Sequence, residues 1–141
     1  HREVLAALVQ GIRDEGLTAR VVKVYHSADL GAIGYTGSQL SGSGIAIGIQ
    51  SKGTTVIHRR GLPPLNNLEL FPQAPNLTLE SYRAIGRNAA RYAKGEPTRP
   101  APVVIDNMAR LKYIVHTTIL HRREIERVEA GRDPEEVIWD E

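Results

Sequence analysis

The stretch from Ser41 to Arg59, with the sequence SGSGIAIGIQSKGTTVIHR, decides the expected fold. Isoleucine recurs at positions 45, 47 and 49, which is the period of a half-buried strand. Residues 54–59 are rich in β-branched side chains and form a second predicted strand. Between them, Ser51-Lys52-Gly53 has the composition of a short turn, so the stretch predicts a β-hairpin with Lys52 at its tip.

Helical patterns lie on both sides of this hairpin. Upstream, apolar residues at helical spacing predict a helix over 2–15, the run 19–25 predicts a strand, and 28–40 is weakly helical. Downstream, Thr78 is a good N-cap for a helix that continues to residue 94. This order of elements predicts one α/β layered domain that spans residues 1–141.

Two further features belong to the C-terminal half. The helix over 78–94 carries a stripe of mostly small residues that favours close packing, namely Tyr82, Gly86, Ala89 and Ala93. A last long helix is expected to begin near Asp106 and to end at Gly131.

Composition excludes several classes of function. The chain has 141 residues and no cysteine, so disulfides, thiolate metal sites and a cysteine nucleophile are excluded. No apolar run approaches the roughly 18 residues that a membrane-spanning helix needs. Lys and Arg number 18 against 16 Asp and Glu, a mild excess that also fits binding of one anionic small molecule, and with one Trp and one Phe the chain lacks the stacking aromatics common in nucleic-acid binders.

The chain opens at His1, without an initiator Met, and enters a helical pattern at once. We therefore expect that an N-terminal segment of the full protein is missing and that it supplies another strand. Any targeting signal would lie in that segment. We expect a cytoplasmic protein.

No self-contained catalytic site is predicted. The five histidines do not form the H-E-x-x-H spacing of a zinc hydrolase, and no G-x-S-x-G elbow is present. His26 and Asp29 share a turn but have no nucleophile beside them. The glycines at 42 and 44 precede a strand instead of following one, which is the wrong order for a dinucleotide-binding motif.

Four groups of residues are candidate binding sites, each with an ordinary alternative. Lys52 beside Ser, Gly and Thr suits one phosphate, or it belongs to a solvated turn. Asp29 accepts hydrogen bonds from amides of a ligand, or it caps the helix that follows. Two polar stripes face either a partner or solvent: one is Arg83, Arg87 and Arg91, and the other is Arg110, Tyr113, Thr117 and His121.

The segment 61–76 holds four prolines and no clear periodicity. Its leucines and Phe71 argue against disorder. An ordered loop of this length is usually functional, so we expect it to lie against another surface.

Three segments together carry a resemblance to a known family. They run from Ser41 to His58, from Leu62 to Pro75, where the sequence LELFPQAP occupies 68–75, and from Gly86 to Lys94 with the sequence GRNAARYAK. The chain resembles the medium subunit of adenosylcobalamin-dependent diol and glycerol dehydratases. The likeness covers nearly the whole chain and is weakest at 26–40 and after Ile119.

The resemblance implies a Rossmann-like, three-layer α/β/α domain with a mixed, mostly parallel sheet. It also implies an assembly with a large catalytic TIM-barrel subunit and a small subunit, as a dimer of heterotrimers, without nucleic acid or membrane. The medium subunit is non-catalytic and covers the lower side and the nucleotide loop of adenosylcobalamin. The bacterial-microcompartment address usual for the family lies in the N-terminal segment.

Carried over position by position, the resemblance implies a set of cofactor contacts: Asp29, Lys52, Thr54, Leu65, Asn67, Phe71, Pro72, Arg110 and Tyr113. One departure concerns Leu111, which stands where the family commonly has proline. A second candidate function is the small subunit of the dehydratase-reactivating factor, and a third is a free-standing binding domain. The sequence at 50–55 and 68–75 favours the dehydratase.

Overall fold

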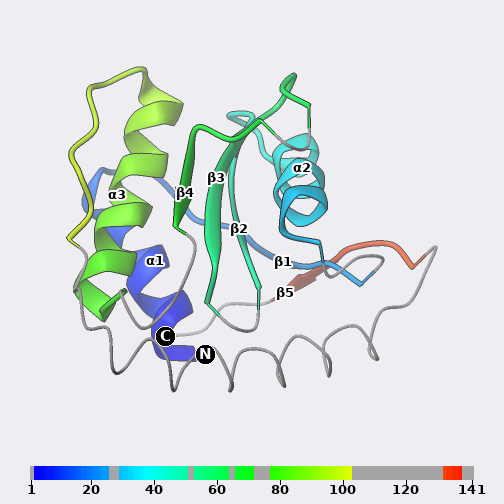
Figure 1. The fold of residues 1–141 in the computed structure, drawn as a ribbon, viewed down its shortest axis with the longest axis horizontal. Helices are drawn as coiled ribbons and strands as arrows, with labels where there is room; N and C mark the ends of the chain where they lie inside the picture. The colour runs from blue at the N-terminus through cyan, green and yellow to red at the C-terminus, as the bar shows by residue number, and fades with distance from the viewer. Residues whose placement is uncertain are drawn as a thin grey trace.

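The computed structural model describes residues 2–25, 29–50, 53–63, 66–71, 77–102 and 132–137. Within these ranges the predicted succession of helix, strand, helix, two strands and helix is found, and two further short strands lie at 69–71 and 135–137 (Figure 1). The elements are α1 (Arg2–Asp14), β1 (Val21–Lys23), α2 (Leu30–Leu40), β2 (Ile45–Ile49), β3 (Thr55–Arg59), β4 (Glu69–Phe71), α3 (Leu79–Lys94) and β5 (Glu135–Val137). The predicted last helix, from 106 to 131, lies outside the described residues.

The predicted hairpin is confirmed. Strands β2 and β3 pair antiparallel, with Ile47 opposite Ile57 and Ile49 opposite Thr55. Strand β4 adds to the other edge of β3, also antiparallel, and places Phe71 opposite Thr55. The described residues therefore contain a three-stranded sheet in the order β2-β3-β4.

The expectation of a Rossmann-like domain with a mixed, mostly parallel sheet is not supported by the part of the chain that the structure describes. All of the strand pairs found there are antiparallel, including β1 with β5 in a separate two-stranded sheet. The tight turn between β2 and β3 returns the chain directly, and such a turn produces only antiparallel pairing. Strand β1 is shorter than predicted and is not hydrogen-bonded to β2.

Helices lie against both faces of the three-stranded sheet (Figure 1). Helix α2 packs on β2 and β3. A Cβ atom on Gly48 would lie 2.9 Å from the backbone nitrogen of Gly34, so the helix and the strand touch backbone to backbone. Helices α1 and α3 cover the other face, where the core contains Leu8, Ile57 and Ile85.

Helices α1 and α3 cross at two glycines. A Cβ atom on Gly11 would overlap the backbone carbonyl of Arg83, and one on Gly86 would overlap that of Leu8. Both helices are therefore closer than any side chain would allow. The predicted small-residue stripe is confirmed at Gly86 and at Ala89, which belongs to the buried core.

Ion pairs border the same helix crossing. Asp14 accepts from Arg83 at 2.7 Å and from Arg87 at 3.2 Å. One residue further, Glu15 pairs with Arg91 at 2.7 Å and with Lys94 at 3.2 Å. The arginine stripe of α3 thus binds acidic groups of its own chain, an arrangement that differs from both sequence-based alternatives.

Side chains of α3 fix its ends and hold the segment that follows it. Thr78 is the N-cap, as predicted, and forms a reciprocal capping box with Ser81. Gly95 ends the helix in the left-handed conformation at φ 72°. Buried Asn88 forms two hydrogen bonds with the backbone of Arg99. Its Nδ2 donates to the Arg99 carbonyl at 2.5 Å, and its Oδ1 accepts from the Arg99 amide at 3.1 Å.

None of the helices in the described part of the chain is both long enough and apolar enough to cross a bilayer.

The glycine contact predicts a stability effect. Gly86→Ala should lower the free energy of unfolding by about 1–3 kcal/mol, because the new methyl group meets backbone that cannot move aside. Gly42→Ala is the matched control, since a Cβ there meets nothing within 4 Å. Urea unfolding of both variants checks this, and equal midpoints would contradict it.

The ion pairs predict a dependence on pH. The Arg83 guanidinium, helped by Gln10, holds the pKa of the Asp14 carboxyl far below its ordinary value. A depressed folded pKa gives stability that is present above the unfolded pKa of about 3.9 and is lost as the pH falls through and below that value. Asp14→Asn should therefore flatten the loss of stability between about pH 5 and pH 2.

Glu3→Gln, on the exposed first turn of the same helix, is the control and should leave the acid limb of the stability curve unchanged. Denaturation followed at several pH values measures both variants. If stability falls as steeply with decreasing pH in Asp14→Asn as in the parent, the ion pairs of Asp14 do not contribute as described.

Candidate functional site

The turn between β2 and β3 is held by a buried carbonyl. The carbonyl oxygen of Gly53 accepts from the Tyr82 hydroxyl of α3 at 2.9 Å and from the Thr55 hydroxyl at 2.8 Å. Tyr82 is itself 3% exposed, so this contact ties the end of the hairpin to the core. Gly53, which follows Lys52 in the sequence, is thus held by two side chains.

Backbone hydrogen bonds close the same turn. The Gln50 amide donates to the Thr54 carbonyl at 3.0 Å, and the Gly53 amide donates to the Gln50 carbonyl at 2.8 Å. Gly53 has φ 91°, a conformation that favours glycine. Thr54, a predicted cofactor contact, is buried and presents little surface to a ligand.

A buried histidine orients Asn67, another predicted contact. His58 is fully buried, and its Nδ1 lies 3.0 Å from Asn67 Oδ1. An amide oxygen only accepts, so Nδ1 carries the proton. The Asn67 NH₂ group is then the donor end and makes no other hydrogen bond with the described residues, while the buried Nε2 of His58 has no partner among them.

An apolar strip lies beside Asn67, on the face of the sheet that carries α2. Helix α2 packs on β2 and β3, and Leu70 of β4 is left 57% exposed opposite buried Val56. Tyr35 of α2 is 39% exposed and meets the His58 ring edge-on, with centroids 6.1 Å apart. Leu70 and Tyr35 thus present apolar surface on the face to which His58 and Asn67 belong.

Asp29 caps α2, one of the two alternatives that the sequence leaves open. Its Oδ1 accepts from the Ala32 amide at 3.1 Å. Gly34 packs over Gly48 and Gly37 over Ala46, so α2 runs antiparallel to β2. The capped end of α2 therefore lies toward the end of the sheet where the β2–β3 turn is.

The described candidates fall into two groups. The first group lies at the turn end of the sheet. It consists of Asp29, of Thr54 and of Phe71, which stands opposite Thr55, the residue after Thr54. Asn67 lies at the other end, bonded to His58. Phe71 is partly buried and packs against the core cluster.

Five other candidates are outside the described residues, namely Lys52, Leu65, Pro72, Arg110 and Tyr113. Their convergence with the described contacts therefore stays a prediction. The described residues contain no group of three or more side chains suited to hold a metal ion.

Sequence reasoning missed three residues that shape this region. The exposure of Leu70 was missed. Side chains alternate along a strand, so Leu70 points to the opposite face from half-buried Phe71, and this alternation was the available signal. His58 contacts Asn67, 9 residues away in the sequence, and Tyr82 contacts Gly53, 29 residues away. Local sequence patterns do not predict contacts of this kind.

Comparison with known families assigns the chain. A family model described as "Dehydratase medium subunit" matches residues 1–99, which is more than half of the chain. The chain belongs to this family of dehydratase medium subunits, as the resemblance of its sequence implied. The match includes the hairpin, its turn and the loop through Pro72, whereas Arg110 and Tyr113 lie beyond it.

Solved structures show the same fold. A glycerol dehydratase reactivase is 20% identical, with a TM-score of 0.66, over 72% of this chain and 88% of that chain. A diol dehydratase-reactivating factor complexed with ADP and Mg2+ is 23% identical, with a TM-score of 0.59, over 69% of this chain and 86% of that chain. At these identities the likeness is one of fold alone.

The contact between Tyr82 and Gly53 is open to a direct test. Tyr82→Phe removes one hydrogen bond to a buried carbonyl that keeps its second donor, Thr55. We expect a loss of about 1 kcal/mol in the free energy of unfolding and faster amide exchange at Gly53 and Thr54. Unchanged exchange at those two amides would show that the hydroxyl does not hold the turn.

Proposed function

We propose that this chain is the non-catalytic medium subunit of a coenzyme-B12-dependent diol or glycerol dehydratase. In this proposal it pairs with the large catalytic subunit, together with a small subunit, and covers the lower side and nucleotide loop of adenosylcobalamin. Family membership supports the coarser part, a subunit of a dehydratase. When bound, adenosylcobalamin supplies the radical chemistry that dehydrates 1,2-propanediol or glycerol to an aldehyde.

The observation that carries the proposal is the anchored backbone that follows Lys52 in the sequence. Gly53 and Thr54 are held by α3 and by their own strand, so the chain next to the lysine is preorganised. An ammonium group on such a turn binds a phosphate with little loss of backbone freedom. The nucleotide loop of cobalamin offers one phosphate, which suits a single lysine aided by Arg110.

The other end of the sheet suits the edge of a corrin ring. Asn67 offers an NH₂ group whose orientation is fixed by buried His58. On the same face Tyr35 offers apolar surface beside His58, and Leu70 offers apolar surface nearer the turn, opposite Val56. A corrin has an apolar rim that bears amide side chains. The apolar side chains suit the rim, and the Asn67 NH₂ group suits the oxygen of a corrin amide. The residues present therefore fit the cofactor.

Lys52→Ala should reduce retention of cobalamin by the assembled complex at least about tenfold, as expected when one charge-assisted phosphate contact is lost. Lys23→Ala, which removes an exposed lysine from β1, is the charge-matched control and should retain cobalamin like the parent. Gel filtration followed by the absorbance of bound corrinoid measures retention. Equal retention in the Lys52→Ala and Lys23→Ala complexes would refute the role of Lys52.

Leu70→Ser should weaken cofactor retention or pairing with the large subunit without lowering the stability of the isolated chain, because the side chain is 57% exposed. Leu79→Ser is the matched control, since Leu79 is 49% exposed at the start of α3. Co-purification and thermal unfolding of both variants give the comparison. A Leu70→Ser complex that assembles and retains cofactor like Leu79→Ser would contradict the apolar strip.

A second candidate function is the small subunit of a dehydratase-reactivating factor. The two solved structures support this alternative as a matter of fold. Co-expression with the large dehydratase subunit and with the large reactivase subunit, each tagged, separates the two. The first proposal requires a stable complex with the dehydratase subunit and no turnover of diol by this chain alone.

A further inference from the structure

One ring nitrogen of His58 is buried without a hydrogen-bond partner. His58 of β3 is fully buried, and its Nδ1 lies 3.0 Å from Asn67 Oδ1, whereas its Nε2 has no partner among the described residues. A Cβ atom on Gly34 would lie 3.3 Å from the His58 Cβ, so α2 packs directly on this residue. Buried polar atoms nearly always have a partner, and an exception of this kind has a physical reason.

The backbone beside Asn67 is fixed independently of the histidine. The Leu68 amide donates to the Ile57 carbonyl at 2.8 Å, which holds this segment against β3. With the Asn67 side chain kept next to His58, the freedom that remains is a half-turn of its terminal amide. That half-turn exchanges Oδ1 and Nδ2, so it decides whether the side chain offers a donor or an acceptor to its surroundings.

The buried Nε2 decides between the two orientations of the amide. If Asn67 turned Nδ2 toward His58, Nδ1 would have to accept and the ring proton would move to Nε2, where none of the described residues offers an acceptor. With Oδ1 toward the ring, Nδ1 donates and Nε2 keeps only a lone pair. Orphaned buried N–H groups are rarer in proteins than acceptors that lack a donor. The closed site around Nε2 therefore turns the Asn67 NH₂ group away from His58.

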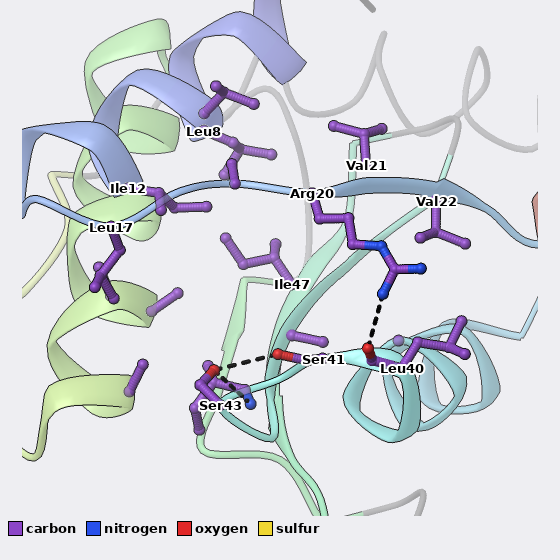
Figure 2. A pocket seen from close by; sticks show the side chains of 18 of the residues that line it. Leu8, Ile12, Leu17, Arg20, Val21, Val22, Leu40, Ser41, Ser43 and Ile47 are labelled. Carbon is purple, nitrogen blue, oxygen red and sulfur yellow. Dashed lines mark hydrogen bonds between the residues drawn. The ribbon is translucent and has the colours of Figure 1, made fainter. Parts of the chain in front are cut away.

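This NH₂ group does not belong to the large apolar cavity of the molecule. That cavity has a volume of about 540 Å³ and lies between β1 and β2, with Ile47 on one wall and Val21 and Val22 on the other (Figure 2). Neither His58 nor Asn67 lines it. Asn67 is half-buried, so a group that approaches from outside the chain can reach its NH₂ group.

We propose that His58 is a positioning residue that acts through Asn67 and gives this contact a fixed polarity, so that it takes a hydrogen-bond acceptor and not a donor. The inference rests on the proposed function for the identity of the ligand. On a corrin the acceptor is the oxygen of a peripheral amide, and a carboxylate in place of that amide binds equally well. The orphaned Nε2 is the structural reason that the contact is directional.

Nitrogen-15 NMR of the histidine rings tests the polarity without any ligand. The chain is measured at about pH 8, where histidine is ordinarily neutral, and the His58→Phe variant identifies the signals of residue 58. The parent should carry the His58 proton on Nδ1 and none on Nε2. Asn67→Ala removes the acceptor and should raise the share of rings that are protonated at Nε2. A parent ring protonated at Nε2 would overturn the proposal.

Retention of cobalamin by the assembled complex tests whether His58 acts through Asn67. His58→Phe keeps a buried ring but leaves the Asn67 amide free to turn, so retention should fall about 2- to 10-fold. In the Asn67→Ala background the same change should have no further effect, because the residue through which it acts is gone. An equal loss in both backgrounds would assign His58 to packing alone and would overturn the positioning role.

Cobalamin monocarboxylic acids, in which one peripheral amide is a carboxylate, test the specificity. The parent complex should retain the isomer altered at the contacting amide as well as it retains cobalamin. Asn67→Asp should retain the same isomer at least about tenfold less, because two carboxylates then meet and no donor lies between them. A parent that rejects this isomer as strongly as Asn67→Asp does would show that Oδ1 faces the ligand.

The proposed function can fail separately from this inference. A parent complex that retains no cobalamin refutes the proposed function, and the ring measurement still decides the polarity of Asn67. Retention by the parent together with a ring protonated at Nε2 supports the function and refutes the inference.

Discussion

The hairpin of β2 and β3 is the element on which the rest of the structure depends, because helices pack on both of its faces. On one face Gly48 touches the backbone of α2. On the other face Ile57 is fully buried under α1 and α3, which meet at Gly11 and Gly86. Close-packed layers of this kind permit few movements, so the ends of the hairpin keep fixed positions.

These fixed ends are where the candidate contacts lie. At one end, Tyr82 reaches from α3 to the Gly53 carbonyl and thereby holds the turn next to Lys52. At the other end, His58 is buried beneath α2 and holds Asn67. In the proposed role the subunit contributes by preorganisation, since a ligand bound by rigid groups loses less free energy to ordering them. Rigid ends of the hairpin are what that role requires.

Local patterns predicted the elements better than their arrangement. The isoleucine alternation, the Thr78 cap and the small residues of α3 are local signals, and the structure confirms each. The mostly parallel sheet was an implication of the family resemblance, and the described strands pair antiparallel because the short turn between β2 and β3 returns the chain directly. The arginine stripe of α3 was ambiguous because its partner Asp14 lies 69 residues from Arg83. Of the predicted site, Asp29, Thr54, Asn67 and Phe71 are described; sequence likeness alone marked Thr54, Asn67 and Phe71 as contacts, whereas Asp29 was also a candidate because of its residue type and position.

The central claim is that the two ends of the hairpin face one corrinoid in an assembled dehydratase. Hydrogen–deuterium exchange of the complex, with and without adenosylcobalamin, tests it most directly. The account predicts that the cofactor slows exchange at 53–54 and at 66–71 and leaves the exposed ends of α1 and α3 unchanged. Cofactor-dependent protection confined to α1 and α3, or absent from this chain, would contradict it.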